Sequence, residues 1–370
     1  MRLHLFFASI TVPLVAAGGL LPAQSQEPVF PGEGWERVRG GQLEEYGWSQ
    51  AGLRSAQAHL RDSSNTTGLV VVDRGRTVFQ FGDIVELSYV ASVRKSILSI
   101  LYGKYVADGT IDLSKTIEEM GLDDVGGLLD IEKQATIEHL ITARSGVYHP
   151  ASNSGDDTAS APERGSQKPG EYMLYNNWDF NAAGAVFEHE TGVNIYDSLQ
   201  EQLALPMQFQ DWDRSAQSKY GNLRVSRNLA YHFHLSTRDM ARIGYLMLRG
   251  GRWEDKQLVP ADWVERISSV VTPLEEMNPV SRRSRYFGYG YMWWVWDGPR
   301  AVGPFEGAYT ARGAVGQWIT VMPAVDLVIA HKTHNVYGRT TSWGSWQTFI
   351  ELLFTAKKGL EMPGPYPWAR

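Results

Sequence analysis

The chain has 370 residues, 43% of them apolar and 21% charged, and its formal net charge is −6. This is an ordinary globular composition with enough apolar residues for a large core, and the mild acidity gives no indication of nucleic-acid or anionic-membrane binding. The sequence has no cysteine, which excludes disulfides, thiolate metal sites and a cysteine nucleophile.

The N-terminal segment differs from the rest. Arg2 precedes an apolar stretch from Leu5 to Leu21 that Pro13 interrupts, and Ala23-Gln24-Ser25 offers small residues for cleavage. This pattern predicts a signal peptide over residues 1–25 and a periplasmic or secreted mature protein, and a retained N-terminal anchor is the main alternative.

Strand patterns lie near both ends of the remaining chain. Gly68–Val72 and Thr77–Phe81 flank a hairpin turn, and a helix pattern closes the chain at Thr341–Leu353. Further strand-like runs are Tyr286–Trp296, Ala314–Met322 and Leu327–His331. These positions predict a sheet built from both ends of the chain.

The middle of the chain, from Ile97 to about Arg285, is mostly helical in pattern. Helices are expected at Asn177–Glu190, after the N-cap Ser236 and after Pro260. The sequence therefore predicts an α/β (α+β) architecture, in which an antiparallel sheet flanked by helices carries an inserted, mainly helical lobe. We expect one domain over residues 26–370, with the α/β part at about 40–100 and 286–360 and the lobe at about 101–285.

Ser92 and Lys95 are the most informative pair in the sequence. They are spaced i and i+3 at the start of an apolar helix pattern, so the lysine amine can lie beside the serine hydroxyl and accept its proton. The helix N-terminus would also favour an oxyanion formed at Ser92. The alternative is a solvated helix face, but a lysine on a largely apolar helix needs a partner or a task.

A second group of candidate residues is Tyr175-Asn176-Asn177, where a loop meets a helix. A phenol close to a lysine can shuttle the proton of a serine, and an asparagine amide can hold Lys95 and a substrate carbonyl. The alternative is an aromatic contact with Asn177 capping the helix. Tyr220-Gly221-Asn222 is a competing triplet, but no helix pattern follows it.

These motifs resemble those of the serine β-lactamase and penicillin-recognising hydrolases, which include D-alanyl-D-alanine carboxypeptidases, β-lactamase-related (family VIII) esterases and 6-aminohexanoate oligomer hydrolases. Ser92-x-x-Lys95 is similar to the family's S-x-x-K motif and Tyr175-x-Asn177 to its Y-x-N motif. The segments Leu140–Gly146 and Leu235–Trp263 also resemble the family. The resemblance implies a β-lactamase/transpeptidase-like fold and an acyl-enzyme at Ser92. We expect no cofactor.

The family's third motif, K-T-G or H-x-G, departs here. The best placement is Ala311-Arg312-Gly313, which lacks the lysine that gathers a substrate carboxylate in lactam-cleaving members. By resemblance, the backbone N–H of Ala314 would be the second oxyanion donor, and Arg312 could supply the missing charge. Lys332-Thr333 is interpreted as a strand end.

These observations favour a serine hydrolase acting on a small-molecule ester or amide. A β-lactamase or carboxypeptidase remains an alternative, as does a non-catalytic cell-wall-binding protein on the same fold. The histidine pairs His232-x-His234 and His331-x-x-His334 lack accompanying carboxylates, so no metal is expected. Two interpretations are open for the tryptophans Trp293, Trp294, Trp296 and Trp318, which either line a substrate cleft or fill the core. The long loop from His149 to Gly170 is a candidate for shaping substrate specificity.

Overall fold

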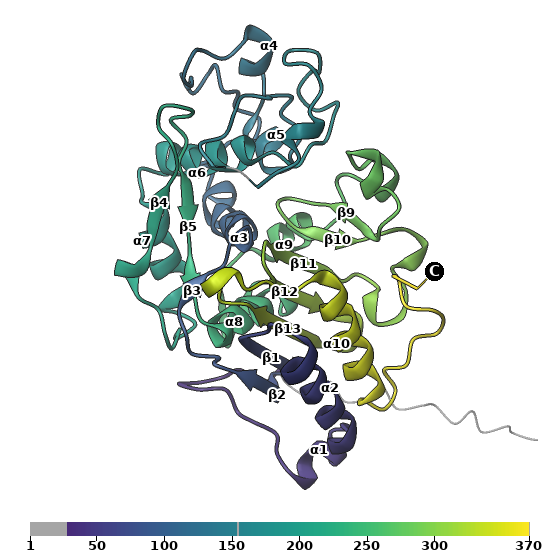
Figure 1. The fold of residues 1–370 in the computed structure, drawn as a ribbon. Helices are drawn as coiled ribbons and strands as arrows, with labels where there is room; N and C mark the ends of the chain where they lie inside the picture. The colour runs from purple at the N-terminus through teal and green to yellow at the C-terminus, as the bar shows by residue number, and fades with distance from the viewer. Residues whose placement is uncertain (1–27, 154, 370) are drawn as a thin grey trace, which may run out of the picture.

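A computed structural model describes residues 28–153 and 155–369, and the predicted signal peptide over residues 1–25 lies outside the described residues. The main element is a seven-stranded sheet in the order β2-β1-β13-β12-β11-β10-β9, with every neighbouring pair antiparallel (Figure 1). Its strands are β1 (Gly68–Asp73), β2 (Arg76–Gly82), β9 (Phe287–Tyr289), β10 (Trp294–Trp296), β11 (Tyr309–Gly313), β12 (Gln317–Met322) and β13 (Leu327–Lys332). The expected antiparallel sheet from both ends of the chain is therefore confirmed.

The centre of the sheet is buried on both faces, since every residue of β1, β12 and β13 is buried. Helix α8 (Thr237–Leu248) packs on β1, β12 and β13. It lies close to β13 because Gly244 has no side chain, and a β-carbon there would be 2.5 Å from Val328. Helices α2 (Gln50–Ser63) and α10 (Trp343–Thr355) pack against each other, and Phe349 and Trp346 of α10 contact Phe79 and Trp318 of the sheet.

The remaining elements are short, apart from two long helices. The helices are α1 (Gly41–Glu45), α3 (Val93–Ala107), α4 (Asp130–Lys133), α5 (Ile137–Ile141), α6 (Asn177–Thr191), α7 (Ile195–Leu199) and α9 (Ala261–Ile267). Three small antiparallel pairs join β3 (Ser88–Tyr89) to β6 (His234–Leu235), β4 (Ser218–Tyr220) to β5 (Ala230–His232), and β7 (Arg252–Trp253) to β8 (Lys256–Gln257). Over the described ranges, no helix has both the length and the apolar character needed to cross a membrane.

Helix α3 lies at the seam of the molecule. It contacts β11, β12 and α9 on the sheet side, and α6 and α7 of the helical lobe, which extends to the top of Figure 1. Because both parts of the molecule pack on α3, eleven of its residues from Val93 to Gly103 are buried. The N-terminus of α3, which carries Ser92, is thereby placed between the sheet and the lobe.

The structure differs from the expected elements in three places. The run Tyr286–Trp296 is a hairpin of β9 and β10 rather than one strand, because Gly290 and the positive φ of Met292 turn the chain. Residues 314–316 form the turn between β11 and β12, and β11 itself was not expected. Helix α8 lies within the interval assigned to the lobe but packs on the sheet, because its apolar face covers β13.

Candidate active site

Ser92 occupies a sharp turn between β3 and α3. The preceding Ala91 has a φ of 49°, a left-handed backbone that is strained for a residue with a side chain. Ser92 is the N-cap residue of α3, yet its hydroxyl accepts no capping hydrogen bond, whereas Ser236 and Ser342 use theirs to cap α8 and α10. The hydroxyl of Ser92, which is half-buried, is thus available for chemistry.

Lys95 lies one turn further along α3 and is only 1% exposed. Its Nζ donates to the phenol oxygen of Tyr175 at 2.6 Å and to Oδ1 of Asn177 at 2.7 Å. Burial and the neighbouring charge of Arg94 lower the pKa of Lys95 well below its usual range, and Asp156, Asp157 and Asp179 oppose the shift. The buried site therefore favours the neutral amine of Lys95 more strongly than aqueous solution does.

Tyr175 connects the lysine to the serine. Burial raises the pKa of its phenol to about 12, and a hydrogen bond with Ser92 together with nearby arginines limits that rise. Because this pKa is far above neutrality, the residue is a phenol rather than a phenolate at neutral pH. Its ring is fixed against Phe180 and Trp294, with centroids 4.9 and 5.3 Å away.

The two asparagines that follow Tyr175 have different tasks. Asn176 caps α6 by accepting from the backbone N–H of Trp178 at 2.9 Å. Asn177 is the first residue of the helix, and its side chain is directed to Lys95. The alternative interpretation, in which Asn177 caps the helix, is therefore wrong, because its neighbour already does so. Ser92, Lys95, Tyr175 and Asn177, predicted from two separate motifs, lie together.

The end of β11 forms the opposite wall. Gly313 approaches the turn before Ser92 so closely that a β-carbon on it would be 2.6 Å from the carbonyl oxygen of Val90. Ala314 follows in a tight turn, with φ values of 60° at Val315 and 102° at Gly316. Within the described residues, neither the backbone N–H of Ser92 nor that of Ala314 donates to a protein acceptor. Both donors are therefore available to a ligand.

Arg312 faces an aromatic cluster at this wall. Its guanidinium carbon lies 4.9, 5.1 and 4.5 Å from the ring centres of Phe287, Trp294 and Trp343. Burial lowers the pKa of Arg312 to about 10. Its positive charge in turn lowers the pKa of Tyr175, against the effect of burial on that phenol. Of the four tryptophans considered in the sequence, only Trp294 packs against the ring of Tyr175, at an interplanar angle of 34°, while Trp293 donates to Ser99 at 3.1 Å within the core.

Three charged residues near the site were not singled out in the sequence. Asp156 accepts from the backbone N–H of Asn177 at 3.0 Å, and the N–H of Asp157 donates to the carbonyl of Tyr175 at 3.0 Å. Arg282 pairs with Asp157 at 2.5 Å and lies 5.0 Å from the ring centre of Trp294. The only sequence signal was the length of the loop from His149 to Gly170, which carries both aspartates.

Other sequence candidates lie elsewhere. Lys332 ends β13 as expected, and its Nζ donates to the carbonyls of Glu86 and Leu235. His331 lies between Thr66 and Gly316, and His334 pairs with Glu86. The described residues hold no group of three or more potential metal ligands. Tyr220 of the competing triplet is 67% exposed and is not in contact with Lys95.

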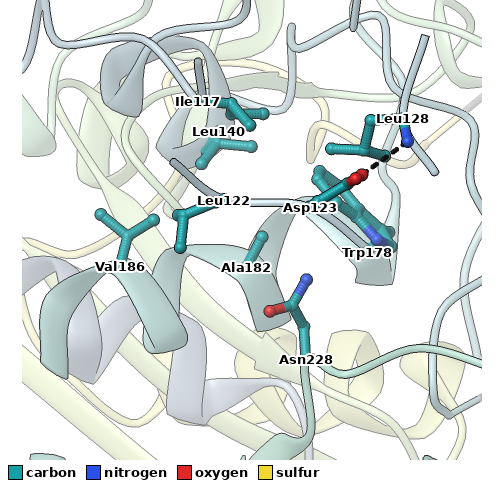
Figure 2. A pocket seen from close by; sticks show the side chains of 9 residues that line it. All are labelled: Ile117, Leu122, Asp123, Leu128, Leu140, Trp178, Ala182, Val186 and Asn228. Carbon is teal, nitrogen blue, oxygen red and sulfur yellow. Dashed lines mark hydrogen bonds between the residues drawn. The ribbon is translucent and has the colours of Figure 1, made fainter. Parts of the chain in front are cut away.

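A small, mainly apolar pocket inside the helical lobe is separate from this site (Figure 2). Trp178, Ala182 and Val186 line it from α6, and Asp123 accepts from the backbone N–H of Leu128 at its rim. These α6 residues belong to a different stripe of the helix from Asn177, which faces Lys95.

The sheet from both ends of the chain, the inserted helices and the serine at the start of the seam helix define a β-lactamase/transpeptidase-like fold. Residues 54–340 match the family model described as Beta-lactamase, so the chain belongs to the Beta-lactamase family of hydrolases. The resemblance on which the sequence analysis depended is therefore confirmed.

Solved structures share the fold at low sequence identity. A putative 6-aminohexanoate-dimer hydrolase from Bacillus anthracis is 19% identical with a TM-score of 0.59, covering 88% of this chain and 86% of that one. A penicillin-binding protein from Bacillus halodurans is 15% identical with a TM-score of 0.59, covering 82% and 100%. EstCE1, a hydrolase with promiscuous acyltransferase activity, is 12% identical with a TM-score of 0.57, covering 82% and 97%. Such identities establish the fold alone.

Proposed function

We propose that this protein is a serine hydrolase that forms an acyl-enzyme at Ser92 and cleaves small carboxylic esters or amides. One observation carries the proposal: buried Lys95 donates to both Tyr175 and Asn177 beside a serine whose hydroxyl does not cap its helix. Burying the ammonium form of a lysine without a carboxylate at hydrogen-bond distance is unfavourable, so the site favours the neutral amine, which can act as a base.

In the proposed mechanism, Oγ of Ser92 attacks the substrate carbonyl carbon and gives up its proton. Burial moves the two pKa values in opposite directions, lowering that of Lys95 and raising that of Tyr175 to about 12, which favours amine and phenol over ammonium and phenolate. Lys95 is therefore the base. In the reactive arrangement the phenol O–H turns toward the lone pair of the neutral amine, so Tyr175 gives its proton to Lys95 as it receives one from Ser92.

The remaining steps use the same groups. The backbone N–H groups of Ser92 and Ala314 stabilise the oxyanion, and the proton held by Lys95 returns through Tyr175 to the leaving alcohol or amine. Water then attacks the acyl-enzyme and its proton passes to Lys95, from which it returns through Tyr175 to Oγ of Ser92 as the carboxylic acid leaves. Asn177 keeps the lysine amine aimed at Tyr175.

The third motif bears on the substrate class. Ala311 is fully buried where lactam-cleaving relatives have a lysine, and Arg312 holds its charge within aromatic rings. This favours ester and amide substrates, in line with the names of the 6-aminohexanoate-dimer hydrolase and EstCE1 structures. A β-lactam or a D-alanyl-D-alanine peptide is the alternative substrate, and Arg312 is the feature that supports it.

Labelling by a fluorophosphonate, followed by intact-mass spectrometry, tests the nucleophile. We expect one adduct on the wild type, none on Ser92→Ala, and an unchanged adduct on Ser114→Ala, which removes an exposed serine. Folded wild type that turns over an ester without any labelling would contradict the proposal. Turnover of p-nitrophenyl esters, a chromogenic cephalosporin and a D-alanyl-D-alanine peptide then ranks the substrate classes, and failure on all of them favours the non-catalytic alternative.

We also propose export, on the pattern of residues 1–25. Fractionation of expressing cells and N-terminal sequencing of the mature chain test this. A cytosolic product that retains Met1 or begins at Arg2 would contradict it.

A further inference from the structure

Arg94, the neighbour of Lys95 on α3, is a buried cation whose charge has no counter-ion within reach. It is 1% exposed, its Nη2 donates to Oδ1 of Asn181 at 2.7 Å, and its guanidinium carbon lies 4.3 Å from the ring centre of Tyr231. Among the residues that the structure describes, its Nη1 has no hydrogen-bond partner and no carboxylate lies within ion-pair distance of it. A buried charge of this kind is unfavourable unless something else compensates it.

The proposed proton transfer makes no direct use of this charge. Asn177 and Asn181 are one turn apart on α6, and they bind Lys95 and Arg94 at the same distance of 2.7 Å. The charge of Arg94 adds to the effect of burial in lowering the pKa of Lys95, which any nearby cation would do. Its effect on Lys95 therefore does not explain why Arg94 is buried without a counter-ion.

A surface groove lies next to Arg94, and we call it the Arg94 groove. It is lined by Tyr89, Ser152, Asn153, Tyr220 and His232. Asn181, which binds Arg94, also donates to Oδ1 of Asn153 at 2.8 Å and to Oγ of Ser152 at 3.3 Å. Arg94 is thus connected to two lining residues through a single side chain.

The charge of Arg94 also changes the pKa of two other lining residues. Burial raises the pKa of Tyr89, and Arg94 opposes that rise. Burial and then Arg94 lower the pKa of His232 to about 4, so this imidazole is neutral at pH 7. Two of the five lining residues therefore contact the partner of Arg94, two more are influenced by its charge, and none of the five carries a carboxylate.

The segments that line the groove also approach the active site. Tyr89 ends β3, three residues before Ser92, and a β-carbon placed on Gly155, which follows the lining segment, would be 3.9 Å from the amide nitrogen of Asn177. A small substrate acylating Ser92 can therefore extend into the groove with the part of the molecule remote from the scissile bond.

We propose that the Arg94 groove binds a carboxylate of the substrate, so that the preferred substrates are esters or amides that carry a second, free carboxylate. The phenol of Tyr89 and the neutral imidazole of His232 offer hydrogen-bond donors to such a group. Arg94 supplies the compensating charge from beneath them. This inference rests on the proposed acyl transfer at Ser92 and adds the chemical class of the substrate.

Matched ester pairs test the inference. One pair is the mono-p-nitrophenyl ester of adipic acid and its methyl-capped neutral form, and the other is 4-carboxyphenyl butyrate and phenyl butyrate. They place the carboxylate on the acyl side and on the leaving side, respectively. We expect the wild type to prefer the charged member of at least one pair by about tenfold to a hundredfold in kcat/KM, which is the usual value of a hydrogen bond to a charged group.

The preference should depend on the groove. Arg94→Gln should reduce the charged-to-neutral ratio to near one, and Tyr89→Phe should reduce it severalfold, which keeps the test decisive if Arg94→Gln fails to fold. The ratio cancels any effect of Arg94 on the pKa of Lys95, because both esters use the same base. Arg224→Gln, which removes an exposed charge from the same part of the chain, should leave the ratio unchanged.

Equal kcat/KM values within both pairs, or a preference that survives both groove variants, would overturn the inference. Turnover of the neutral esters would in that case still support acyl transfer at Ser92. Loss of all turnover in folded wild type would instead count against the proposed function, so the two failures are distinguishable.

Discussion

Gly313, the last residue of β11, lies so close to Val90 that a β-carbon on it would be 2.6 Å from the Val90 carbonyl oxygen and 3.1 Å from the side chain of Ala91. The contact joins the end of the sheet to the turn that presents Ser92. It places the backbone of Ala314, one residue further along, beside the N-terminus of α3. The requirement for glycine here comes from another segment of the chain, because the φ of Gly313 is not in the left-handed region.

The first prediction follows from that contact. Gly313→Ala should force β11 and the Ser92 turn apart, lowering kcat on the order of tenfold to a hundredfold through misplacement of the oxyanion donors. The free energy of unfolding should fall by about 1–3 kcal/mol, which is typical of overpacking. Gly344→Ala is the control, because the nearest atom to its β-carbon is 3.8 Å away. Wild-type kinetics in Gly313→Ala would show that the contact does not position the site.

The sequence predicted the local part of the site better than the distant part. Ser92 and Lys95 could be placed together from helical spacing alone, since i and i+3 share a face. Tyr175 lies 80 residues from Lys95, and only the resemblance to a family indicated that they meet. Asp157 and Arg282, separated by 125 residues, had no such guide, because charged residues in loops are common and pairing depends on the fold.

The fold shows the same division between local and distant information. β1 and β13 were evident because their apolar residues form continuous, bounded runs, and β2 because its β-favouring residues follow a hairpin turn. Strand β11 was missed because Tyr309–Gly313 is short and ends in Arg312-Gly313, which has little strand character. The packing of α8 on the sheet depends on Gly244 meeting Val328, a contact that no periodicity within α8 reveals.

The second prediction concerns the relay. Tyr175→Phe keeps the ring packing against Phe180 and Trp294 but removes the oxygen that accepts from Lys95. Acylation of Ser92 should slow on the order of 10²–10⁴-fold, the usual contribution of a positioned proton-transfer group. Stopped-flow release of p-nitrophenol measures this rate. Tyr172→Phe, a nearby tyrosine outside the site, should acylate at the wild-type rate, and an equally fast Tyr175→Phe would remove the phenol from the mechanism.

The third prediction is a loss of stability in mild acid. His331 is 1% exposed, lies between Thr66 and the carbonyl of Gly316, and has a pKa that burial lowers to about 4. An unfolded histidine has a pKa of about 6.5, so below that pH the unfolded chain binds a proton that the native protein excludes. Stability is therefore full above pH 6.5 and is lost progressively down to pH 4.

The size of this loss follows from the two pKa values. The difference between about 6.5 and about 4 corresponds to about 3.5 kcal/mol at 1.4 kcal/mol per pH unit. Urea unfolding at several pH values between 7 and 4 measures it. His331→Gln should flatten that part of the pH dependence, whereas the exposed His189→Gln should not. An unchanged slope in His331→Gln would assign the acid sensitivity to other groups.

The fourth prediction concerns the pH dependence of catalysis. If neutral Lys95 is the base, kcat/KM rises with pH as the amine loses its proton, and the midpoint lies well below the ordinary lysine pKa of about 10.4 because burial disfavours the ammonium form. A profile that rises only above pH 10 would contradict the assignment of Lys95 as a base of lowered pKa.

The aspartates of the long loop provide an independent check on that assignment. Asp157 raises the pKa of Lys95 by its negative charge, so Asp157→Asn should move the acid limb of the kcat/KM profile to lower pH by a measurable fraction of a unit. Its backbone N–H still reaches the carbonyl of Tyr175 in that variant, which limits the change in geometry. Glu163→Gln removes an exposed acid from the same loop and should leave the limb in place. Removing a carboxylate next to Lys95 can only lower the pKa of its ammonium form. A shift of the limb to higher pH in Asp157→Asn would therefore indicate that the titrating group is not Lys95.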